Sequence, residues 1–110
     1  MYSRVTLFEL DTVRFDLTDA VERFTDLVLP ELREQPGYEG VYVLANPDGK
    51  GLVVSFWQSE GDADAAVRAG FYDAQLERFV AVFRSPPGRE GYDVVAADAP
   101  ARAPAYGVER

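Results

Sequence analysis

The chain has 110 residues, a formal net charge of −8 and 47% hydrophobic residues, which suits one globular domain. The negative charge argues against partners that select basic surfaces, so we expect neither nucleic acid nor an anionic membrane as a partner. The sequence has no Cys and no His, which excludes disulfides, thiolate chemistry and the usual zinc and haem ligands, and we expect no metal and no cofactor.

Residues 3–10 predict the first strand, with Val5 and Leu7 on one face and Thr6 and Phe8 on the other. No apolar run is long enough to span a membrane, and no signal-peptide pattern precedes this strand. We therefore expect a cytoplasmic protein.

A helix is predicted next, with Asp16 or Thr18 as its cap. Pro30 falls inside the helical pattern and should kink or restart the helix, since proline has no N–H to donate to the carbonyl four residues back. Pro36-Gly37 ends the segment. The apolar positions that define the 3.6-residue period are Ala20, Val21, Phe24, Leu27, Val28 and Leu32.

A β-hairpin is the clearest local signal, with strands at about 38–46 and 51–59 joined by the turn residues 46–51. Half-exposed antiparallel strands alternate apolar and polar residues, but these two strands are apolar at nearly every position. Both faces of the sheet must therefore be covered. The rest of the chain offers helices for one face only, so the other face needs a second copy of the protein or a ligand.

The remaining elements complete the pattern. Ser59 with Asp62 predicts a helix start, Gly70 an interruption, and a longer helix follows until residues 85–88 stop it. Its apolar face is formed by Tyr72, Leu76, Phe79, Val80 and Phe83. Residues 90–97 predict the last strand. The order β-α-β-β-α-β predicts a ferredoxin-like α+β fold over residues 1–97, with a four-stranded antiparallel sheet, helices on one face and a C-terminal tail at 98–110.

Several short segments resemble a known family. They are Pro36-Gly37-Tyr38-Glu39-Gly40, Phe56-Trp57, Gly70-Phe71-Tyr72-Asp73 and Pro86-Pro87-Gly88-Arg89-Glu90-Gly91-Tyr92. Over residues 3–97 the sequence resembles the dimeric α+β barrel superfamily, in particular proteins grouped with antibiotic biosynthesis monooxygenases. The resemblance implies that two sheets close a barrel across a homodimer, with a pocket between helices and sheet in each protomer.

The resemblance also carries expectations about activity. Characterised members of that group oxidise phenolic polycycles with O₂ and no cofactor, and relatives degrade haem or dismutate chlorite. Many members have a His shortly after the third strand, whereas residues 59–63 here contain none. We therefore do not expect haem-linked chemistry.

Trp57 and Tyr72 are the candidate catalytic residues. Trp57 lies in phase with Ser55 on the third strand, so its ring beside a small side chain can floor an aromatic pocket, and in family oxygenases a Trp of this strand lines the pocket. The Tyr72 hydroxyl can bind or deprotonate a phenol where no His is present. The alternative is that both are ordinary core or rim aromatics.

Four further residues are candidate ligand-binding residues: Tyr42, Asn46, Ser55 and Leu76. The neighbours of Asn46 also fit a purely structural role in the turn. Arg89 and Glu90 are interpreted as a surface or dimer ion pair, with anion binding at the pocket mouth as the alternative.

Three functions stay open at this point. The first is a cofactor-independent monooxygenase or oxidase of a phenolic or polyaromatic small molecule. The second is a non-catalytic dimer that binds a hydrophobic or aromatic ligand. The third is an isomerase or cyclase of the same fold. Fold analogy alone does not separate them.

Overall fold

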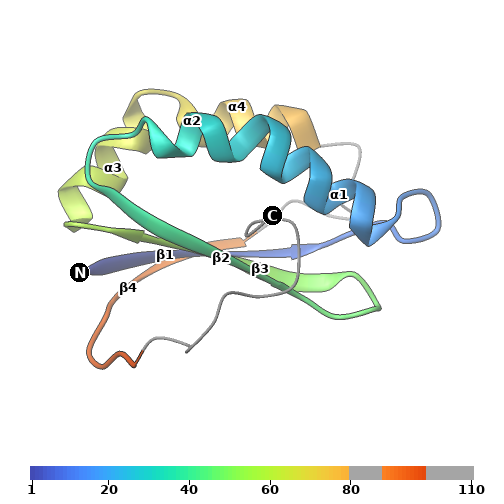
Figure 1. Cartoon of the computed structure of the whole chain (residues 1–110). Coiled ribbons are helices and arrows are strands. Elements are labelled where there is room, and N and C mark those ends of the chain that lie inside the picture. The colour runs from blue at the N-terminus through green and yellow to red at the C-terminus, as the bar shows by residue number, and fades with distance from the viewer. Residues whose placement is uncertain (80–87, 99–110) are drawn as a thin grey trace.

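A computed structural model of the chain describes residues 1–79 and 88–98. It confirms the predicted α+β class and ferredoxin-like order, with all helices on one face of an antiparallel sheet (Figure 1). The elements are β1 (Tyr2–Glu9), α1 (Leu17–Arg23), η1 (Phe24–Val28), α2 (Leu29–Arg33), β2 (Tyr38–Ala45), β3 (Lys50–Trp57), α3 (Glu60–Arg68), α4 (Phe71–Phe79) and β4 (Gly88–Asp93).

The sheet has the strand order β2-β3-β1-β4, so β1 pairs with both β3 and β4. The register places Thr6 opposite Val53 on β3 and opposite Arg89 on β4. Successive side chains on a strand point to opposite faces, so the even-numbered residues of β1 face the helices and the odd-numbered ones face away. The predicted separation of Thr6 and Phe8 from Val5 and Leu7 is confirmed.

The hairpin turn and the start of α3 form as predicted, whereas α1 lacks the predicted cap: Asp16 occupies the N-cap position without a side-chain hydrogen bond, and Thr18 lies within the helix. The Asn46 Oδ1 accepts hydrogen bonds from the N–H groups of Asp48 and Lys50, at 3.0 and 3.2 Å, which closes the turn between β2 and β3. The Ser59 hydroxyl accepts from the Asp62 N–H at 3.2 Å and caps α3. Gly70 has φ of +88°, a conformation that side chains disfavour, and it separates α3 from α4.

The first helical segment departs from a regular helix at Pro30. Proline cannot donate to the Asp26 carbonyl, and η1 forms a π-turn in which the Leu29 N–H donates to the Phe24 carbonyl, five residues back. The wider turn holds one extra residue and rotates the following side chains. Leu29 is therefore buried at 4% exposure and Leu27, which we expected on the apolar face, is 45% exposed.

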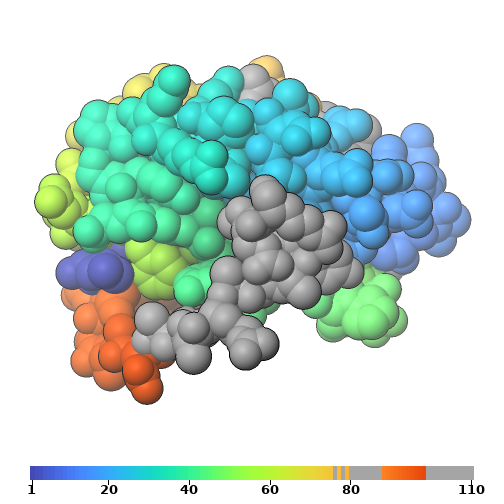
Figure 2. All heavy atoms as spheres, in the orientation of Figure 1, coloured from blue at the N-terminus to red at the C-terminus, as the bar shows by residue number. Residues whose placement is uncertain are grey.

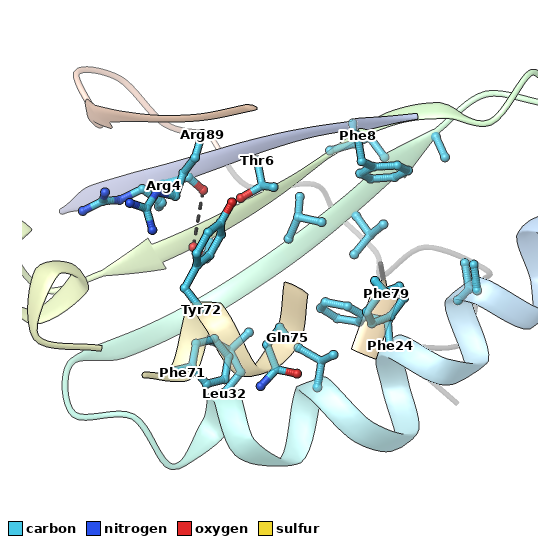
Figure 3. Close-up of a pocket in the computed structure, with 18 of the residues that line it drawn as sticks. Arg4, Thr6, Phe8, Phe24, Leu32, Phe71, Tyr72, Gln75, Phe79 and Arg89 are labelled. Carbon is cyan, nitrogen blue, oxygen red and sulfur yellow. Dashed lines mark hydrogen bonds between the residues drawn. The ribbon is translucent and has the colours of Figure 1, made fainter. Parts of the chain in front are cut away.

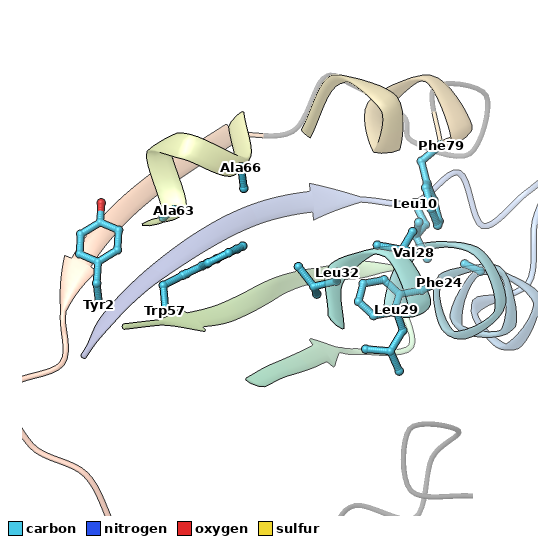
Figure 4. Packing of buried hydrophobic residues seen from close by; sticks show 11 residues of the cluster. Tyr2, Leu10, Phe24, Val28, Leu29, Leu32, Trp57, Ala63, Ala66 and Phe79 are labelled. Atoms are coloured by element: carbon cyan, nitrogen blue, oxygen red, sulfur yellow. The ribbon is translucent and has the colours of Figure 1, made fainter. Parts of the chain in front are cut away.

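Residues of the π-turn and α2 pack into the core together with Trp57 and Phe79 (Figure 4). On the side seen in Figure 2, the atoms of α2 and β2 close against each other, whereas the turn between β2 and β3 stands apart from the helices. The cluster of buried hydrophobic residues comprises Tyr2, Leu10, Ala20, Phe24, Val28, Leu29, Leu32, Trp57, Ala63, Ala66 and Phe79.

The face of the sheet that points away from the helices, called here the open face, is apolar. Leu7, Tyr42, Leu44 and Tyr92 lie on it and are 40–51% exposed. No described helix covers these side chains, as the two-sided apolar strands predicted.

The last strand was predicted over 90–97, but β4 spans Gly88–Asp93. Its pairing runs from Leu7 with Gly88 to Tyr2 with Asp93, and the Val94 N–H then donates to the Met1 carbonyl at 3.0 Å. Pairing ends there because β1 begins at Tyr2. The predicted helix end at residues 85–87 and the predicted tail beyond Asp98 lie outside the described residues.

Within the part of the chain that the structure describes, no helix combines the length and apolar character needed to cross a membrane.

The π-turn makes a matched pair of leucine variants informative. Leu29→Ala should lower the free energy of unfolding by about 2–5 kcal/mol, because it removes a buried side chain and leaves a cavity. Leu27→Ala makes the same substitution at an exposed position two residues earlier and should cost less than about 1 kcal/mol. Urea unfolding of both variants checks this. Equal losses, or the larger loss at Leu27, would contradict the rotation of the helix at Pro30.

Candidate functional site

A cavity of about 420 Å³ lies between the helices and the sheet, within the size range of small-molecule sites (Figure 3). Its described lining comes from every element. The lining residues are Arg4, Thr6, Phe8, Leu10, Leu17, Ala20, Val21, Phe24, Val28, Leu32, Val43, Leu44, Ala45, Val53, Ser55, Trp57, Ala63, Ala66, Val67, Phe71, Tyr72, Gln75, Phe79 and Arg89.

One end of the cavity is aromatic and apolar. Phe8 reaches it from β1, Phe24 from η1 and Phe79 from α4, and Figure 3 shows the Phe24 and Phe79 rings side by side with Phe8 across from them on the sheet. Gln75 ties α4 to α2 by donating to the Glu31 carboxylate at 2.8 Å, so the helical wall is joined across two segments. This end can bury the flat hydrocarbon surface of a ligand.

The other end of the cavity is polar and cationic. The Tyr72 ring rises from α4 toward Arg89, Arg4 and Thr6 (Figure 3). The Arg89 guanidinium lies over the Tyr72 ring, with Cζ 4.2 Å from the centroid. The Arg4 Nη2 donates to the Asp64 Oδ1 at 2.6 Å. A guanidinium on an aromatic face is a favourable pairing that also fixes the ring position.

Trp57 floors the cavity beneath the small residues of α3. Its ring lies flat under Ala63 and Ala66 (Figure 4), and only 3% of the residue is exposed. The indole N–H donates to the Ser55 hydroxyl at 2.9 Å, and that hydroxyl donates to the Arg4 carbonyl at 3.3 Å. The polar atom of Trp57 is thus used within the protein, and the ring offers its apolar surface to the cavity.

The structure brings together only some of the predicted site residues. Trp57, Tyr72 and Ser55 line the cavity. Tyr42 lies on the open face, edge-on to Phe56 with centroids 6.1 Å apart, and Asn46 is the hairpin turn residue described above. Neither reaches the cavity, because strand alternation directs Tyr42 away from the helices and the turn uses the Asn46 amide oxygen. The Leu76 side chain lies outside the described part of the structure.

The sequence did not indicate Arg4 and Thr6 as cavity residues. Arg89 was interpreted as a surface or dimer ion pair with Glu90, with anion binding at the pocket mouth as the alternative. Adjacent residues on a strand face opposite ways, so Arg89 points into the cavity, whereas Glu90 accepts a hydrogen bond from the Tyr92 hydroxyl on the open face. Strand alternation could have identified both residues, because Arg4 and Thr6 lie on the same face of β1 as Phe8.

Two tyrosines outside the cavity lining have altered acidity. Burial raises the pKa of Tyr38, and the nearby Arg33 charge lowers that pKa in part. The hydrogen bond from Tyr92 to the Glu90 carboxylate raises the pKa of Tyr92. Both phenols therefore stay neutral near pH 7, since an ordinary tyrosine titrates near pH 10.

The described lining carries hydroxyl, amide and guanidinium groups but no carboxylate, and the whole sequence has no His. Over residues 1–79 and 88–98, no group of three or more acidic side chains is placed to hold a metal ion. These polar groups can bind and orient a ligand. The hydroxyl and amide groups of the described lining are weak bases for removing a proton from it.

The sequence matches the model of a known protein family. Residues 15–78, more than half of the chain, match the family model described as antibiotic biosynthesis monooxygenase. This range runs from just before α1 into α4 and includes both Trp57 and Tyr72. A search of curated protein sequences gives no match.

Solved structures share the fold at low sequence identity. NE2512, a protein of unknown function from Nitrosomonas europaea, has a TM-score of 0.70 and 19% identity over 92% of this chain and 95% of that chain. SnoaB, a cofactor-independent oxygenase from Streptomyces nogalater, has a TM-score of 0.69 and 13% sequence identity, and the match covers 87% of this chain and 94% of that chain. The monooxygenase from the gene ActVA-Orf6 of Streptomyces coelicolor was solved in complex with the ligand nanaomycin D. Its TM-score is 0.64 and its sequence identity 20%, and the match covers 91% of this chain and 92% of that chain.

The hydrogen bond between Trp57 and Ser55 can be tested by a double-mutant cycle. Ser55→Ala leaves the buried indole N–H without an acceptor and should lower the free energy of unfolding by about 1–3 kcal/mol. In a Trp57→Phe background, which has no N–H, the same substitution should cost clearly less. Denaturant unfolding of the two single variants and the double variant measures the coupling. Additive losses in the free energy of unfolding would show that the Ser55 hydroxyl does not stabilise the protein through a hydrogen bond with the indole.

Proposed function

This chain belongs to the antibiotic biosynthesis monooxygenase family of dimeric α+β barrels, and from that premise we propose that it is a homodimeric, cofactor-independent oxygenase of a phenolic or polyaromatic small molecule. The observation that carries the proposal is the cavity of about 420 Å³, with aromatic walls and a few convergent polar groups at one end. Two solved structures of this fold support the proposal: SnoaB is a cofactor-independent oxygenase, and the protein from the gene ActVA-Orf6 is a monooxygenase in complex with nanaomycin D.

The proposed chemistry needs no resident redox group, because the substrate supplies the electrons. Removal of a proton from an activated ring methylene leaves a carbanion, which passes its electron pair to O₂ and forms a carbon–oxygen bond. The resulting hydroperoxide takes up a proton and then loses water to give a ketone. One methylene group and one O₂ thus become one carbonyl group and one water. The protein contributes an apolar pocket, orientation and polar groups near the developing oxyanion.

Trp57 and Tyr72 are the proposed catalytic residues. The Trp57 ring supplies a flat surface for the substrate rings, and the Tyr72 hydroxyl lies at the polar end, where a substrate oxygen would be oriented. Ser55 acts in the proposal by fixing the Trp57 ring through its hydrogen bond. Leu76, on α4, remains a proposed ligand contact.

One observation favours a second candidate, a dimeric binding module for a hydrophobic or aromatic molecule. The described lining contains no carboxylate and the chain contains no His, so the usual general bases are absent from the site. Binding needs only the apolar walls and the polar end. Oxygen consumption separates the two candidates.

The homodimer is proposed from the open face. Leu7, Tyr42, Leu44 and Tyr92 are each at least 40% exposed on one sheet surface, and such a contiguous apolar surface marks an interaction site. A second copy would place the same residues against themselves, the arrangement typical of two-fold symmetric interfaces. Stable interfaces of this kind commonly bury more than about 2,000 Å² in total.

The oxygenase proposal predicts loss of turnover without loss of folding. Trp57→Phe and Tyr72→Phe keep most of the apolar volume, and each should slow oxygen uptake with anthrone-like phenols by about 10²–10⁴-fold. Tyr92→Phe, on the open face, is the control and should retain activity. Oxygen electrode assays with parallel thermal melts check this. No uptake across a panel of such phenols would favour the binding module, and unchanged turnover in both variants would remove these residues from the site.

The dimer proposal predicts different effects for two leucines of similar exposure. Leu7→Glu places a charge on the open face, where Leu7 is 51% exposed, and should convert the dimer to a monomer of 12.2 kDa, because a buried unpaired carboxylate is costly. Leu27→Glu places the same charge on the outer side of the helical layer, where Leu27 is 45% exposed, and should leave the dimer intact. Sedimentation equilibrium at micromolar concentration measures both. A monomeric parent protein would contradict the proposed assembly.

A further inference from the structure

The polar end of the cavity carries more positive than negative charge. Arg4 is paired with Asp64, whose side chain is 44% exposed, whereas Arg4 itself is 16% exposed. Arg89 has no carboxylate partner among the described residues and is held by the Tyr72 ring. The cavity lining itself holds two guanidinium groups and no carboxylate among the described residues, and Asp64 compensates only Arg4. Asp93, at the end of β4, is exposed and is not part of the lining. About one positive charge is therefore uncompensated within the cavity, in a protein whose formal charge is −8.

Two N–H donors at this end have no acceptor. The Arg4 Nε and the Arg89 Nη1 are both buried and make no hydrogen bond within residues 1–79 and 88–98. Buried donors are almost always paired, since an unpaired one loses its hydration without compensation. A ligand oxygen within the cavity would pair with both, and each hydrogen bond would be assisted by charge.

The strand register brings the two arginines together. Arg89 lies opposite Thr6, and Arg4 lies opposite Gly91, so Arg4 and Arg89 are diagonal neighbours on the same face of β1 and β4. Long side chains at such positions reach each other. Thr6 lies opposite Arg89 and two residues along β1 from Arg4, and Figure 3 shows all three beside Tyr72.

We propose that the Arg4–Arg89 end of the cavity binds a carboxylate, so that the ligand is an aromatic acid whose rings extend along the apolar walls toward Phe24 and Phe79. A carboxylate matches the planar guanidinium geometry, and its single charge balances the one uncompensated cation. A phosphate dianion would leave an excess negative charge in an apolar site. The inference rests on the proposed function, because it specifies the substrate class for the same cavity.

Binding of two matched probes tests the inference without any turnover. Trp57 is the only Trp in the chain and floors the cavity, so quenching of its fluorescence reports a ligand there. Anthraquinone-2-carboxylate should bind at least about tenfold more tightly than anthraquinone-2-carboxamide, which has the same rings and no charge. The negative charge of the whole protein disfavours non-specific binding of the acid.

Three arginine variants assign the preference to this site. Arg89→Gln should reduce the carboxylate preference to less than about threefold and leave the affinity for the carboxamide unchanged, which also shows that the cavity is intact. Arg89→Lys keeps the charge without the planar fork and should give an intermediate preference. Arg68→Gln removes an exposed cation from α3 and should keep the full preference.

Equal affinity of the parent protein for both probes would overturn the inference, and so would a preference that survives in Arg89→Gln. A carboxylate preference lost in Arg89→Gln, in a protein that consumes no oxygen, would support the acid site and reject the oxygenase. Oxygen uptake without any carboxylate preference would retain the oxygenase and overturn the acid site.

Discussion

β1 lies between β3 and β4, and its register with both neighbours determines which side chains line the cavity. With the observed pairing, Arg4, Thr6 and Phe8 face the helices, and Val5 and Leu7 lie on the open face. A shift of one residue would exchange the two sets, so that two apolar residues entered the cavity and the arginine left it. The central position of β1 makes such a shift costly, since both of its hydrogen-bonded edges would have to move.

The same three residues give the cavity its direction. Along β1, the cavity-facing side chains change from the guanidinium of Arg4 to the hydroxyl of Thr6 and the aromatic ring of Phe8. The side chains of α4 change from polar to apolar in the same direction. Tyr72 stands over the arginine end and Phe79, two turns later on α4, stands over the aromatic end. A ligand with one polar and one hydrocarbon end therefore has a single favourable orientation, which is what positions a reacting carbon relative to fixed groups.

The sequence predicted those features that depend on short-range chemistry. The turn at Asn46 and the cap at Ser59 are made by side chains bonding backbone groups two to four residues away, so a local pattern suffices. Leu29 could not be placed, because the π-turn that buries it arises from Pro30 acting on a carbonyl four residues back and shifts the helical period.

The end of β4 and the positions of Arg4 and Arg89 depend on pairing between residues far apart in sequence. A strand of sequence Gly-Arg-Glu-Gly-Tyr-Asp has no apolar alternation, and only its register with β1 shows that Arg89 is interior. A charged residue on a strand is exposed in most proteins, which is the reason the pair Arg89 and Glu90 was interpreted as a surface ion pair.

The weak proton acceptors of the site and its excess positive charge fit one another. A cation within about 4–6 Å of a bound acid lowers the pKa of that acid by about 1 to 3, since it stabilises the anion that forms. Where no ligand carboxylate balances Arg89, a phenol or enol held beside this guanidinium would therefore release its proton to a weaker base than it would need in water. Trp57 and the aromatic end exclude water from the same space, and this strengthens the effect of the charge. Under the oxygenase proposal, guanidinium groups in place of His or carboxylate would favour substrates that ionise on binding and supply the electrons that reduce O₂.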